Sequence, residues 1–305
     1  PASVRRMKLL LLGANGQVGH ELRRALAPLG DVVCTTRSGA LADGTRCETA
    51  DFDAPASLLS LVERIAPDVV VNAAAHTAVD NAESDAEAAM RANAEAPAAI
   101  AQACARRGAL LVHYSTDYVF DGTATRPYRE DDPTSPLGVY GQTKLAGERA
   151  IRASGCPHMI FRTAWVYADH GRNFLLTMLR LAKDRDELRV VADQAGTPTP
   201  AALIADVTAQ VLQRRAGQTG LWHLTASGAT TWHGFASEIM AQAVDRGLLA
   251  RSPSVVPIAT ADFPTPARRP AYSCLETAAL VRDFGIQLPD WRDGLSDVLA
   301  RLHVA

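Results

Sequence analysis

A glycine-rich loop near the start of the chain constrains the fold more than any other segment. Residues 8–12 form a continuous apolar run of strand length, and glycines at positions 13, 16 and 19 follow it, ahead of a helical pattern over residues 21–29. Glycines at this spacing let the backbone approach a pyrophosphate, whose charge then lies at a helix N-terminus. The segment predicts a dinucleotide-binding β-α unit, and with it a doubly wound parallel α/β sheet.

The end of the expected second strand, residues 31–36, decides which cofactor such a loop accepts. An acidic residue about 20 positions after the glycines would bind a ribose 2′-hydroxyl and repel a 2′-phosphate. The residues found there are Thr35, Thr36, Arg37 and Ser38, without a carboxylate. Arg37 is able to pair with a phosphate, and a solvated surface charge is the alternative. We therefore expect NADPH as the cofactor, with NADH as a second one that the protein can also use.

A second group of chemistry-bearing residues lies further along. Tyr140 and Lys144 stand four residues apart among good helix formers, so both side chains share one helix face. A nearby cation lowers a tyrosine pKa from about 10 toward the working pH, and a phenol so placed can donate a proton to a carbonyl oxygen. Thr116 follows an apolar run, residues 110–114, that is typical of a buried strand. Ligands of open α/β sheets bind beyond such strand ends, so we expect Thr116 beside the substrate.

Each of these signals has a simpler explanation when taken alone. A Tyr–Lys pair at this spacing arises by chance on many helices, and Ser-Thr-Asp after a strand is common turn chemistry. Their order in the chain is what favours catalysis. The strand, the hydroxyl side chain and Tyr-x-x-x-Lys follow one another downstream of a nucleotide-binding loop.

Composition excludes several classes of function. The chain has 305 residues, of which 48% are hydrophobic and 21% charged, with a formal net charge of -2. A basic field of the kind that binds nucleic acid or membrane surfaces is missing from this composition. The five cysteines form no C-x-x-C pair, which fits a reducing compartment and argues against zinc. No apolar run approaches the roughly 20 residues of a membrane span, and no signal peptide precedes the first strand. We expect a cytoplasmic protein that acts on a small molecule.

The remaining segments suggest alternating strands and helices, followed by a less regular part. Further strands are expected at 48–52, 68–75, 158–165 and 221–224, helices at 55–66, 86–107 and 173–183, and proline-rich loops at 196–200 and 252–270. We expect a dinucleotide-binding Rossmann domain over residues 7–165, completed by parts of 190–240. A smaller, interleaved α/β substrate-binding lobe would cover 166–305, mainly 166–190 and 240–305.

Two smaller signals concern the ligands. Asp51 and Phe52, at the exit of the third strand, are expected near the adenine edge of the cofactor. Arg268 and Arg269 stand next to each other in the second proline-rich loop. Guanidinium groups match phosphate oxygens, so these arginines are candidates for holding a substrate diphosphate. Solvated loop charges are the alternative.

Several long motifs in a fixed order carry a resemblance that covers the chain from Met7 onward. They are GANGQVG at 13–19, VNAAAHTAVDNAE at 71–83, HYSTDYVFDG at 113–122, SPLGVYGQTKLAGE at 135–148, FRTAWVY at 161–167 and FPTPARRPAYSCL at 263–275. Together they resemble the extended short-chain dehydrogenases/reductases, and within them the dTDP-4-dehydrorhamnose reductase family. Such long motifs are far more specific than the glycine loop alone.

The resemblance implies roles for the matching positions. The catalytic residues would be Thr116, Tyr140 and Lys144. With Arg37 added from the second strand, the cofactor contacts would be Gly13, Asn15, Gly16, Gln17, Val18, Gly19, Arg37, Asp51, Phe52, Ala73, Ala74, Ala75, Tyr140 and Lys144. With the two loop arginines added, the substrate contacts would be Thr77, Val79, Thr116, Asp117, Tyr118, Tyr140, Trp165, Asn173, Arg268 and Arg269.

Two departures from the family pattern bear on cofactor and metal. Thr36 stands where relatives often have an aspartate at the end of the second strand, which puts a preference for NADH in doubt. Some relatives hold a metal with carboxylates at a subunit contact, but Ala202 and Arg292 stand where those carboxylates would be sought. We therefore expect no metal. A homodimer is a candidate assembly.

The implied reaction is reduction of the C4 keto group of dTDP-4-dehydro-L-rhamnose by NADPH, giving dTDP-L-rhamnose. This is the last step of dTDP-rhamnose biosynthesis, which supplies rhamnose to polymers such as lipopolysaccharide. Tyr140 would donate the proton to O4, Thr116 would position that oxygen, and Lys144 would hold the nicotinamide ribose and lower the tyrosine pKa. Two alternatives stay open. One is a related nucleotide-sugar epimerase or dehydratase, and the other is a non-catalytic NADP-binding regulatory subunit resembling that of methionine adenosyltransferase.

Overall fold

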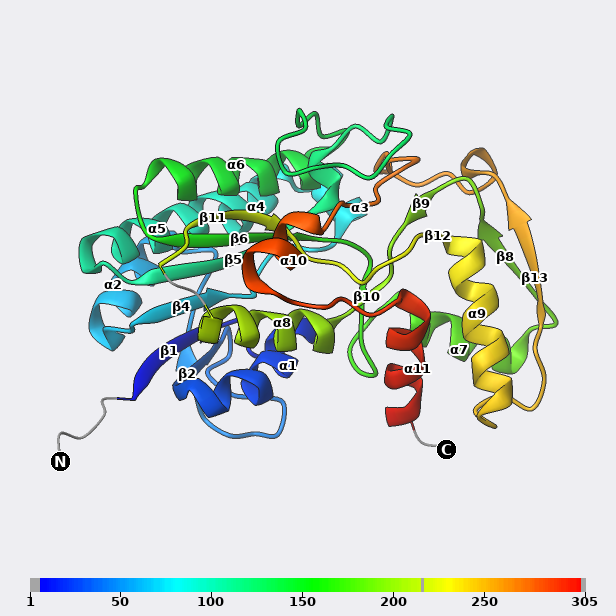
Figure 1. Ribbon diagram of the computed structural model, residues 1–305, viewed down its shortest axis with the longest axis horizontal. Helices are drawn as coiled ribbons and strands as arrows, with labels where there is room; N and C mark the ends of the chain where they lie inside the picture. Colours follow the sequence, from blue (N-terminus) through cyan, green and yellow to red (C-terminus); the bar gives the residue numbers. More distant parts are fainter. Residues whose placement is uncertain (1–5, 215–216, 303–305) are drawn as a thin grey trace.

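A seven-stranded sheet in which every neighbouring pair is parallel forms the centre of the protein (Figure 1). The computed structural model describes residues 6–214 and 217–302. The strands are β1 (Met7–Leu12), β2 (Gly30–Thr36), β3 (Glu48–Thr49), β4 (Val69–Asn72), β5 (Leu110–Thr116), β6 (His158–Thr163) and β11 (Gly220–His223). Across the sheet their order is β11-β6-β5-β4-β1-β2-β3. The winding therefore reverses between β1 and β4, the place where such sheets bind ligands.

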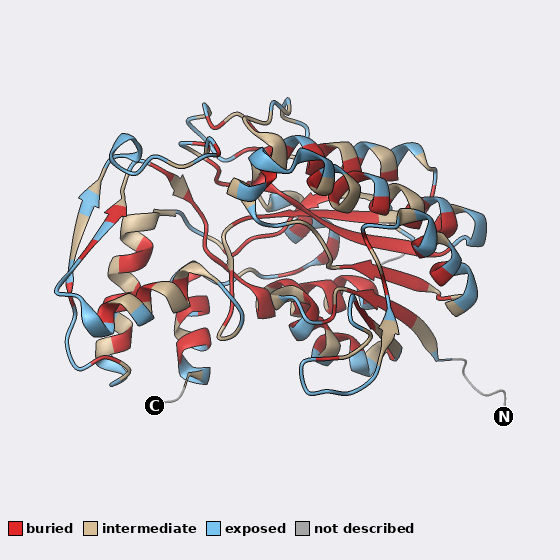
Figure 2. Cartoon of the chain, turned by 180° about the vertical axis from the view of Figure 1, so that it is seen from behind, coloured by how far each residue is buried: buried red, intermediate tan, exposed pale blue. Residues whose placement is uncertain are grey.

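Helices cover both faces of this sheet, and the leucines of β1 show why. Successive strand residues point to opposite faces, so Leu9 and Leu11 join one hydrophobic cluster while Leu10 and Leu12 join the other. All four are fully buried, as are most of the central strands in Figure 2. One face is covered by α1 (Gln17–Leu26), α8 (Ala201–Arg214) and α10 (Ala278–Phe284), and the other by α2 (Pro55–Ile65), α5 (Ala96–Arg107) and α6 (Val139–Ala153). The predicted doubly wound α/β class is confirmed.

The helix predicted over residues 86–107 is interrupted. A π-helical turn, Arg91–Glu95, joins α4 (Ala86–Met90) to α5. Pro97 has no N–H to donate to the preceding turn, which favours a wider turn at this point. Within the turn, the buried Asn93 donates from Nδ2 to the His76 carbonyl at 3.0 Å and to Thr143 Oγ1 at 3.1 Å. The interruption therefore fastens α6 to the loop that follows β4.

A smaller group of elements packs around its own hydrophobic cluster, at the right of Figure 1. It contains α7 (Phe174–Asp184), α9 (Trp232–Asp245), α11 (Trp291–Arg301) and the parallel pair β8 (Glu187–Val191) and β13 (Ser254–Ile258). Leu175, Phe235 and Leu299 are buried where these elements meet. We propose that this group is the substrate-binding lobe and that α8 and β11 complete the Rossmann domain. Residues 303–305 of the lobe lie outside the described residues.

Part of the proline-rich segment 252–270 is a strand, contrary to our prediction of a loop. β13 pairs along its whole length with β8, and Pro257 lies opposite Val190. Both strands of a two-stranded sheet are edges, where a residue without an N–H is tolerated. The segment 196–200 is likewise not a plain loop, because it includes parts of the two-residue strands β9 (Ala195–Gly196) and β10 (Thr199–Pro200). Proline is unfavourable in the interior of a large sheet, but it is tolerated in edge strands such as these.

Candidate active site

A cavity of about 940 Å³ runs along the carboxyl ends of the central strands. Its wall takes residues that follow β2, β1, β4, β5 and β6, which are neighbours in that order across the sheet. The predicted cofactor loop and the predicted catalytic residues therefore share one cavity. The predicted residues on its wall are Gly13, Gly16, Gln17, Val18, Arg37, Phe52, Ala73, Ala74, Ala75, Thr77, Val79, Thr116, Asp117, Tyr118, Tyr140, Lys144 and Trp165.

The glycine loop is shaped by close backbone approach. Gly13 has φ +82°, and a Cβ added there would lie 2.8 Å from the amide nitrogen of Ala74, so the position requires glycine. Gly16 is the N-cap of α1, which begins at the cavity with Gln17 and Val18. Unlike these residues, Gly19 is buried and does not line the cavity. Gly19 lets α1 pack directly on Gly13, and its contact with the cofactor stays a prediction.

We expect Gly19→Ala to destabilise the protein and weaken cofactor binding together. A Cβ at this position would lie 2.0 Å from the carbonyl oxygen of Gly13, so α1 must move away from the loop. Overpacking of this kind costs about 1–3 kcal/mol. Thermal unfolding and NADPH titration measure the two effects. Gly108→Ala is the control: that Cβ would meet nothing within 4 Å, so only the left-handed backbone cost of about 1–2 kcal/mol should appear, with NADPH affinity unchanged.

At the β2 end, the cavity is lined by Thr36, Arg37, Phe52 and Asp53. Asp51 does not line it, because its Oδ1 accepts the N–H of Asp53 at 3.0 Å within the turn, and its contact with the adenine stays a prediction. Asp53 takes its place on the wall, and sequence reasoning missed it although it stands only two residues further on. The tight turn before α2, rather than the strand itself, decides which carboxylate faces the cavity.

Asn15 lies beside a second cavity of about 310 Å³ instead of the larger one. Its Nδ2 donates to the carbonyl of Ala40 and its Oδ1 accepts the N–H of Ala42, both at 3.0 Å. These bonds hold the loop after β2 against the glycine loop. Asn15 therefore shapes the β2 end of the site through the backbone of its neighbours.

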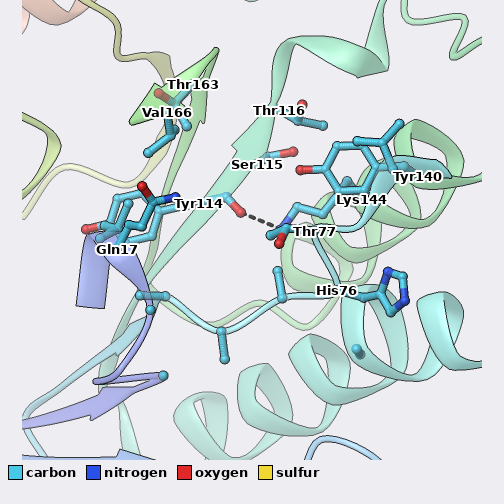
Figure 3. A pocket seen from close by; sticks show the side chains of 18 of the residues that line it. Gln17, His76, Thr77, Tyr114, Ser115, Thr116, Tyr140, Lys144, Thr163 and Val166 are labelled. Carbon is cyan, nitrogen blue, oxygen red and sulfur yellow. Dashed lines mark hydrogen bonds between the residues drawn. The ribbon is translucent and has the colours of Figure 1, made fainter. Parts of the chain in front are cut away.

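Thr116, Tyr140 and Lys144 come together as the sequence predicts (Figure 3). Thr116 is the last residue of β5, and the other two project from α6 toward it. Lys144 Nζ donates to the backbone carbonyl of Tyr114 at 2.6 Å. Thr116 Oγ1 donates to Asp117 Oδ1 at 3.0 Å and accepts the N–H of Tyr118 at 3.1 Å. A short network therefore fixes the hydroxyl of Thr116 beside the phenol.

The electrostatics of the pair differ from our expectation. Burial raises the pKa of Tyr140 to about 12, opposed by a hydrogen bond with Thr116. Burial also lowers the pKa of Lys144 to about 8, opposed by the carboxylate of Glu148 one helical turn away. The prediction that Lys144 draws the tyrosine pKa toward neutrality is wrong here, since the ammonium group bonds to the Tyr114 carbonyl and the phenol lies in a low-dielectric site. Tyr140 is therefore a fully protonated phenol near pH 7.

An aromatic pair closes another part of the cavity wall. Trp165 has φ +48°, unusual for a bulky residue, and its ring stacks on Trp232 with centroids 3.5 Å apart. A Cβ added at Gly196 would lie 2.5 Å from the Trp165 ring, so glycine is needed there as well. Trp232 begins α9 and was missed, because a tryptophan at the start of a distant helix carries no motif. The strained backbone of Trp165 and this stack define a flat apolar surface on the cavity wall.

Asn173, Arg268 and Arg269 do not line the large cavity, and their contacts with the substrate stay predictions. Asn173 caps α7 by accepting the N–H of Leu176, and its Nδ2 donates to Gln17 at 2.8 Å. This hydrogen bond joins the start of α7 to the glycine-rich segment.

The two loop arginines have different neighbours. Arg269 forms an ion pair at 2.8 Å with Asp80, in α3 (Val79–Ser84), so it is not free to bind a diphosphate in this arrangement. Arg268 is exposed and lines a small cavity that Tyr118 and Tyr140 also border. The diphosphate role of the two arginines stays a prediction.

Comparison with known proteins shows the family of the chain. The family described as RmlD substrate binding domain matches residues 7–304. A dTDP-4-dehydrorhamnose reductase of Burkholderia thailandensis is 52% identical over 295 residues, covering 94% of this chain and 96% of that protein. The chain belongs to the dTDP-4-dehydrorhamnose reductase family. That of Escherichia coli is 46% identical over 97% of this chain and 98% of its own length.

Solved structures of the dTDP-4-dehydrorhamnose reductase family have the same fold. The reductase of Clostridium acetobutylicum is 37% identical, with a TM-score of 0.86, over 96% of this chain and 99% of that one. The reductase of Bacillus anthracis, crystallised with NADP, is 31% identical, with a TM-score of 0.88, over 97% and 100% of the two chains. The resemblance that the sequence motifs carried is confirmed.

One group of side chains has the composition of a cation site. Within residues 6–214 and 217–302, Glu21, Asp169 and His170 form one group whose ligand atoms all lie within 4.8 Å of one another. Arg24 and Arg301 approach the Glu21 carboxylate at 3.6 and 3.2 Å. Two guanidinium groups already supply the positive charge that a cation would bring, so we assign no metal to this group.

Proposed function

We propose that the protein reduces the C4 keto group of dTDP-4-dehydro-L-rhamnose to dTDP-L-rhamnose with NADPH, the last step of dTDP-rhamnose biosynthesis. One observation carries the proposal: a single cavity joins the glycine loop and Arg37 to Thr116, Tyr140 and Lys144. The match to reductases along nearly the whole chain supports it. An oxidoreductase needs both halves of such a cavity, one for the cofactor and one for the carbonyl compound.

The residues at the β1 and β2 ends fit NADPH. Gly13 and Gly16 leave room for a pyrophosphate at the N-terminus of α1, whose first turn carries no acidic residue. Ala73, Ala74 and Ala75 offer small side chains and backbone groups to the riboses, and Phe52 offers an apolar face to the adenine. NADPH, when bound, supplies the hydride for the reduction.

The residues at the β5 end would handle the proton. Tyr140 holds it on the phenol oxygen, because a pKa of about 12 keeps that group protonated, and would donate it to O4. Thr116 would position O4 through its hydroxyl, and Lys144 would bind the nicotinamide ribose. Thr77, Val79, Asp117, Tyr118 and Trp165 would line the sugar nucleotide site.

The two alternative functions are disfavoured by the comparisons. The relatives are named as reductases, and a non-catalytic subunit has no need of a complete Thr-Tyr-Lys set in the cavity. The deciding experiment supplies purified protein with NADPH and enzymatically generated dTDP-4-dehydro-L-rhamnose. We expect loss of NADPH absorbance with formation of dTDP-L-rhamnose. A changed sugar nucleotide with NADPH left untouched would establish the epimerase or dehydratase instead.

The proposed partners are small molecules and a second copy of the chain. We propose a homodimer, which analytical ultracentrifugation tests. In the described parts of the chain, no helix is both long enough and apolar enough for a membrane span.

We expect Arg37→Ala to weaken NADPH binding roughly 10- to 100-fold, the range for losing a charge-assisted contact of about 1.5–3 kcal/mol. NADH lacks the 2′-phosphate, so its affinity should change little. Isothermal titration of both cofactors measures the difference. Equal losses of affinity for the two cofactors would mean that Arg37 supports the site without a specific contact with the 2′-phosphate.

A further inference from the structure

Arg37 stands between two cavities at the adenosine end of the site. It lines the large cavity and also the neighbouring cavity of about 310 Å³. Its Nη2 donates to Asp53 Oδ2 at 2.7 Å. Asp53 lines the large cavity and is absent from the wall of the smaller one. The ion pair therefore holds the guanidinium group on the side of the large cavity.

The smaller cavity has the chemistry of an anion site. Apart from Arg37, its wall consists of Gly13, Asn15, Gly16, Thr36 and Ser38, none of which carries a charge. The hydroxyls of Thr36 and Ser38 lie 3.4 Å apart and can both donate to the carbonyl of Ala40. They are thus polar groups at the end of β2, where the second ribose hydroxyl of a dinucleotide lies in folds of this class. A phosphate on that hydroxyl would find one cation within reach, Arg37.

We propose that Asp53 sets the cofactor preference by competing with the 2′-phosphate for Arg37. This inference rests on the proposed use of NADPH. Both side chains of the pair are well exposed, at 74% and 48%, and exposed ion pairs contribute little to stability. A phosphate monoester carries more negative charge than a carboxylate and offers three acceptor oxygens, so it can displace Asp53 from the guanidinium group.

Asp53 has a second effect, because its carboxylate stays on the cavity wall after it loses Arg37. It then repels a bound 2′-phosphate, whereas it can accept a hydrogen bond from the 2′-hydroxyl of NADH. The end of β2 carries no carboxylate, but the turn after β3 places that of Asp53 in contact with Arg37, the cation that favours the phosphate. The pair therefore moderates the preference for NADPH and preserves binding of NADH.

Binding measurements on Asp53→Asn test the competition. Isothermal titration is done with adenosine 2′,5′-bisphosphate and adenosine 5′-monophosphate, which differ only in the 2′-phosphate, and with NADPH and NADH. Loss of an exposed competing pair should tighten the bisphosphate and NADPH by about 2- to 5-fold. The monophosphate and NADH should bind equally or more weakly. No sugar nucleotide is present, so the result does not depend on whether the protein reduces one.

Two further variants make the test specific. Glu63→Gln removes the same charge from an exposed pair with Arg106 at 3.0 Å that lines neither cavity, and it should change none of the affinities. In an Arg37→Ala background, Asp53→Asn should tighten the bisphosphate less than it does in the native protein, because only the direct repulsion by Asp53 remains to be removed. The proposal is overturned if Asp53→Asn leaves the ratio of the two nucleotide affinities unchanged, or if the gain is equally large without Arg37.

Discussion

Tyr140→Phe should lower turnover by roughly 10²- to 10⁴-fold, the range for loss of a general acid, while NADPH binding stays close to native. The substitution removes the phenol oxygen that holds the proton and keeps the ring. That ring packs edge-on against Tyr118, with centroids 5.6 Å apart, and phenylalanine preserves this contact. Steady-state NADPH consumption gives the turnover, and isothermal titration gives the cofactor affinity.

Tyr167→Phe is the matched control for this experiment. Tyr167 is also buried, it lies outside the cavity, and within the described residues its hydroxyl has no hydrogen-bond partner. Its loss should therefore leave turnover unchanged. A Tyr140→Phe protein with near-native turnover would show that another group or a water donates the proton, and the central assignment of this site would be wrong.

The fold could be predicted from the sequence wherever one segment showed both a hydrophobic pattern and a residue that ends the element, such as glycine. The apolar run of β1 alone fits either a strand or a buried helix segment, and the glycines that follow it decide for a strand. In the structure this strand is buried on both faces, and Gly13 has φ +82° against Ala74. Tyr140 and Lys144 were accessible for a similar reason, since helical spacing places them on one face. These inferences are local, and local geometry decides them.

Several site residues have partners that a motif does not name. Arg269, a candidate for holding a diphosphate, pairs with Asp80, 189 residues earlier. Asn173, an expected substrate contact, also uses its amide between α7 and Gln17. Trp232 reaches the cavity from the small lobe, without any signal near the other site residues. Such long-range contacts depend on how the elements pack in three dimensions. The spacing of residues along the sequence does not reveal them.

The predicted direction of the Tyr140 pKa shift was wrong. Spacing correctly placed a cation one turn away, but it gave no information on burial. Both side chains lie in a low-dielectric site, where desolvation disfavours the phenolate and the ammonium group together. The site therefore presents a protonated phenol at neutral pH, which is the form that can donate a proton.

Glu148→Gln should cost roughly 3–5 kcal/mol of unfolding free energy, the usual cost of breaking a buried ion pair from one side. Glu148 accepts two hydrogen bonds from Arg162, from Nε at 2.9 Å and from Nη2 at 2.7 Å. Their side chains are only 2% and 3% exposed. Glutamine keeps the shape but removes the carboxylate that holds the buried guanidinium group by two hydrogen bonds. Lys144, a second buried cation one turn away, adds to the cost, because Glu148 favours its charged form.

Denaturant unfolding measures the loss, and two comparisons identify its origin. Glu63→Gln breaks an exposed pair by the same substitution and should cost under about 1 kcal/mol. The double variant Glu148→Leu/Arg162→Met replaces both charges of the pair by apolar groups, so it should recover the part of the loss that comes from Arg162, since no guanidinium group remains buried without its partner. The part that comes from Lys144 should persist. If the double variant were as unstable as Glu148→Gln, the cost would come from altered packing beside Lys144. If Glu148→Gln cost no more than Glu63→Gln, water would have to reach Arg162 in solution, and the catalytic helix would be less tightly held than its buried ion pair implies.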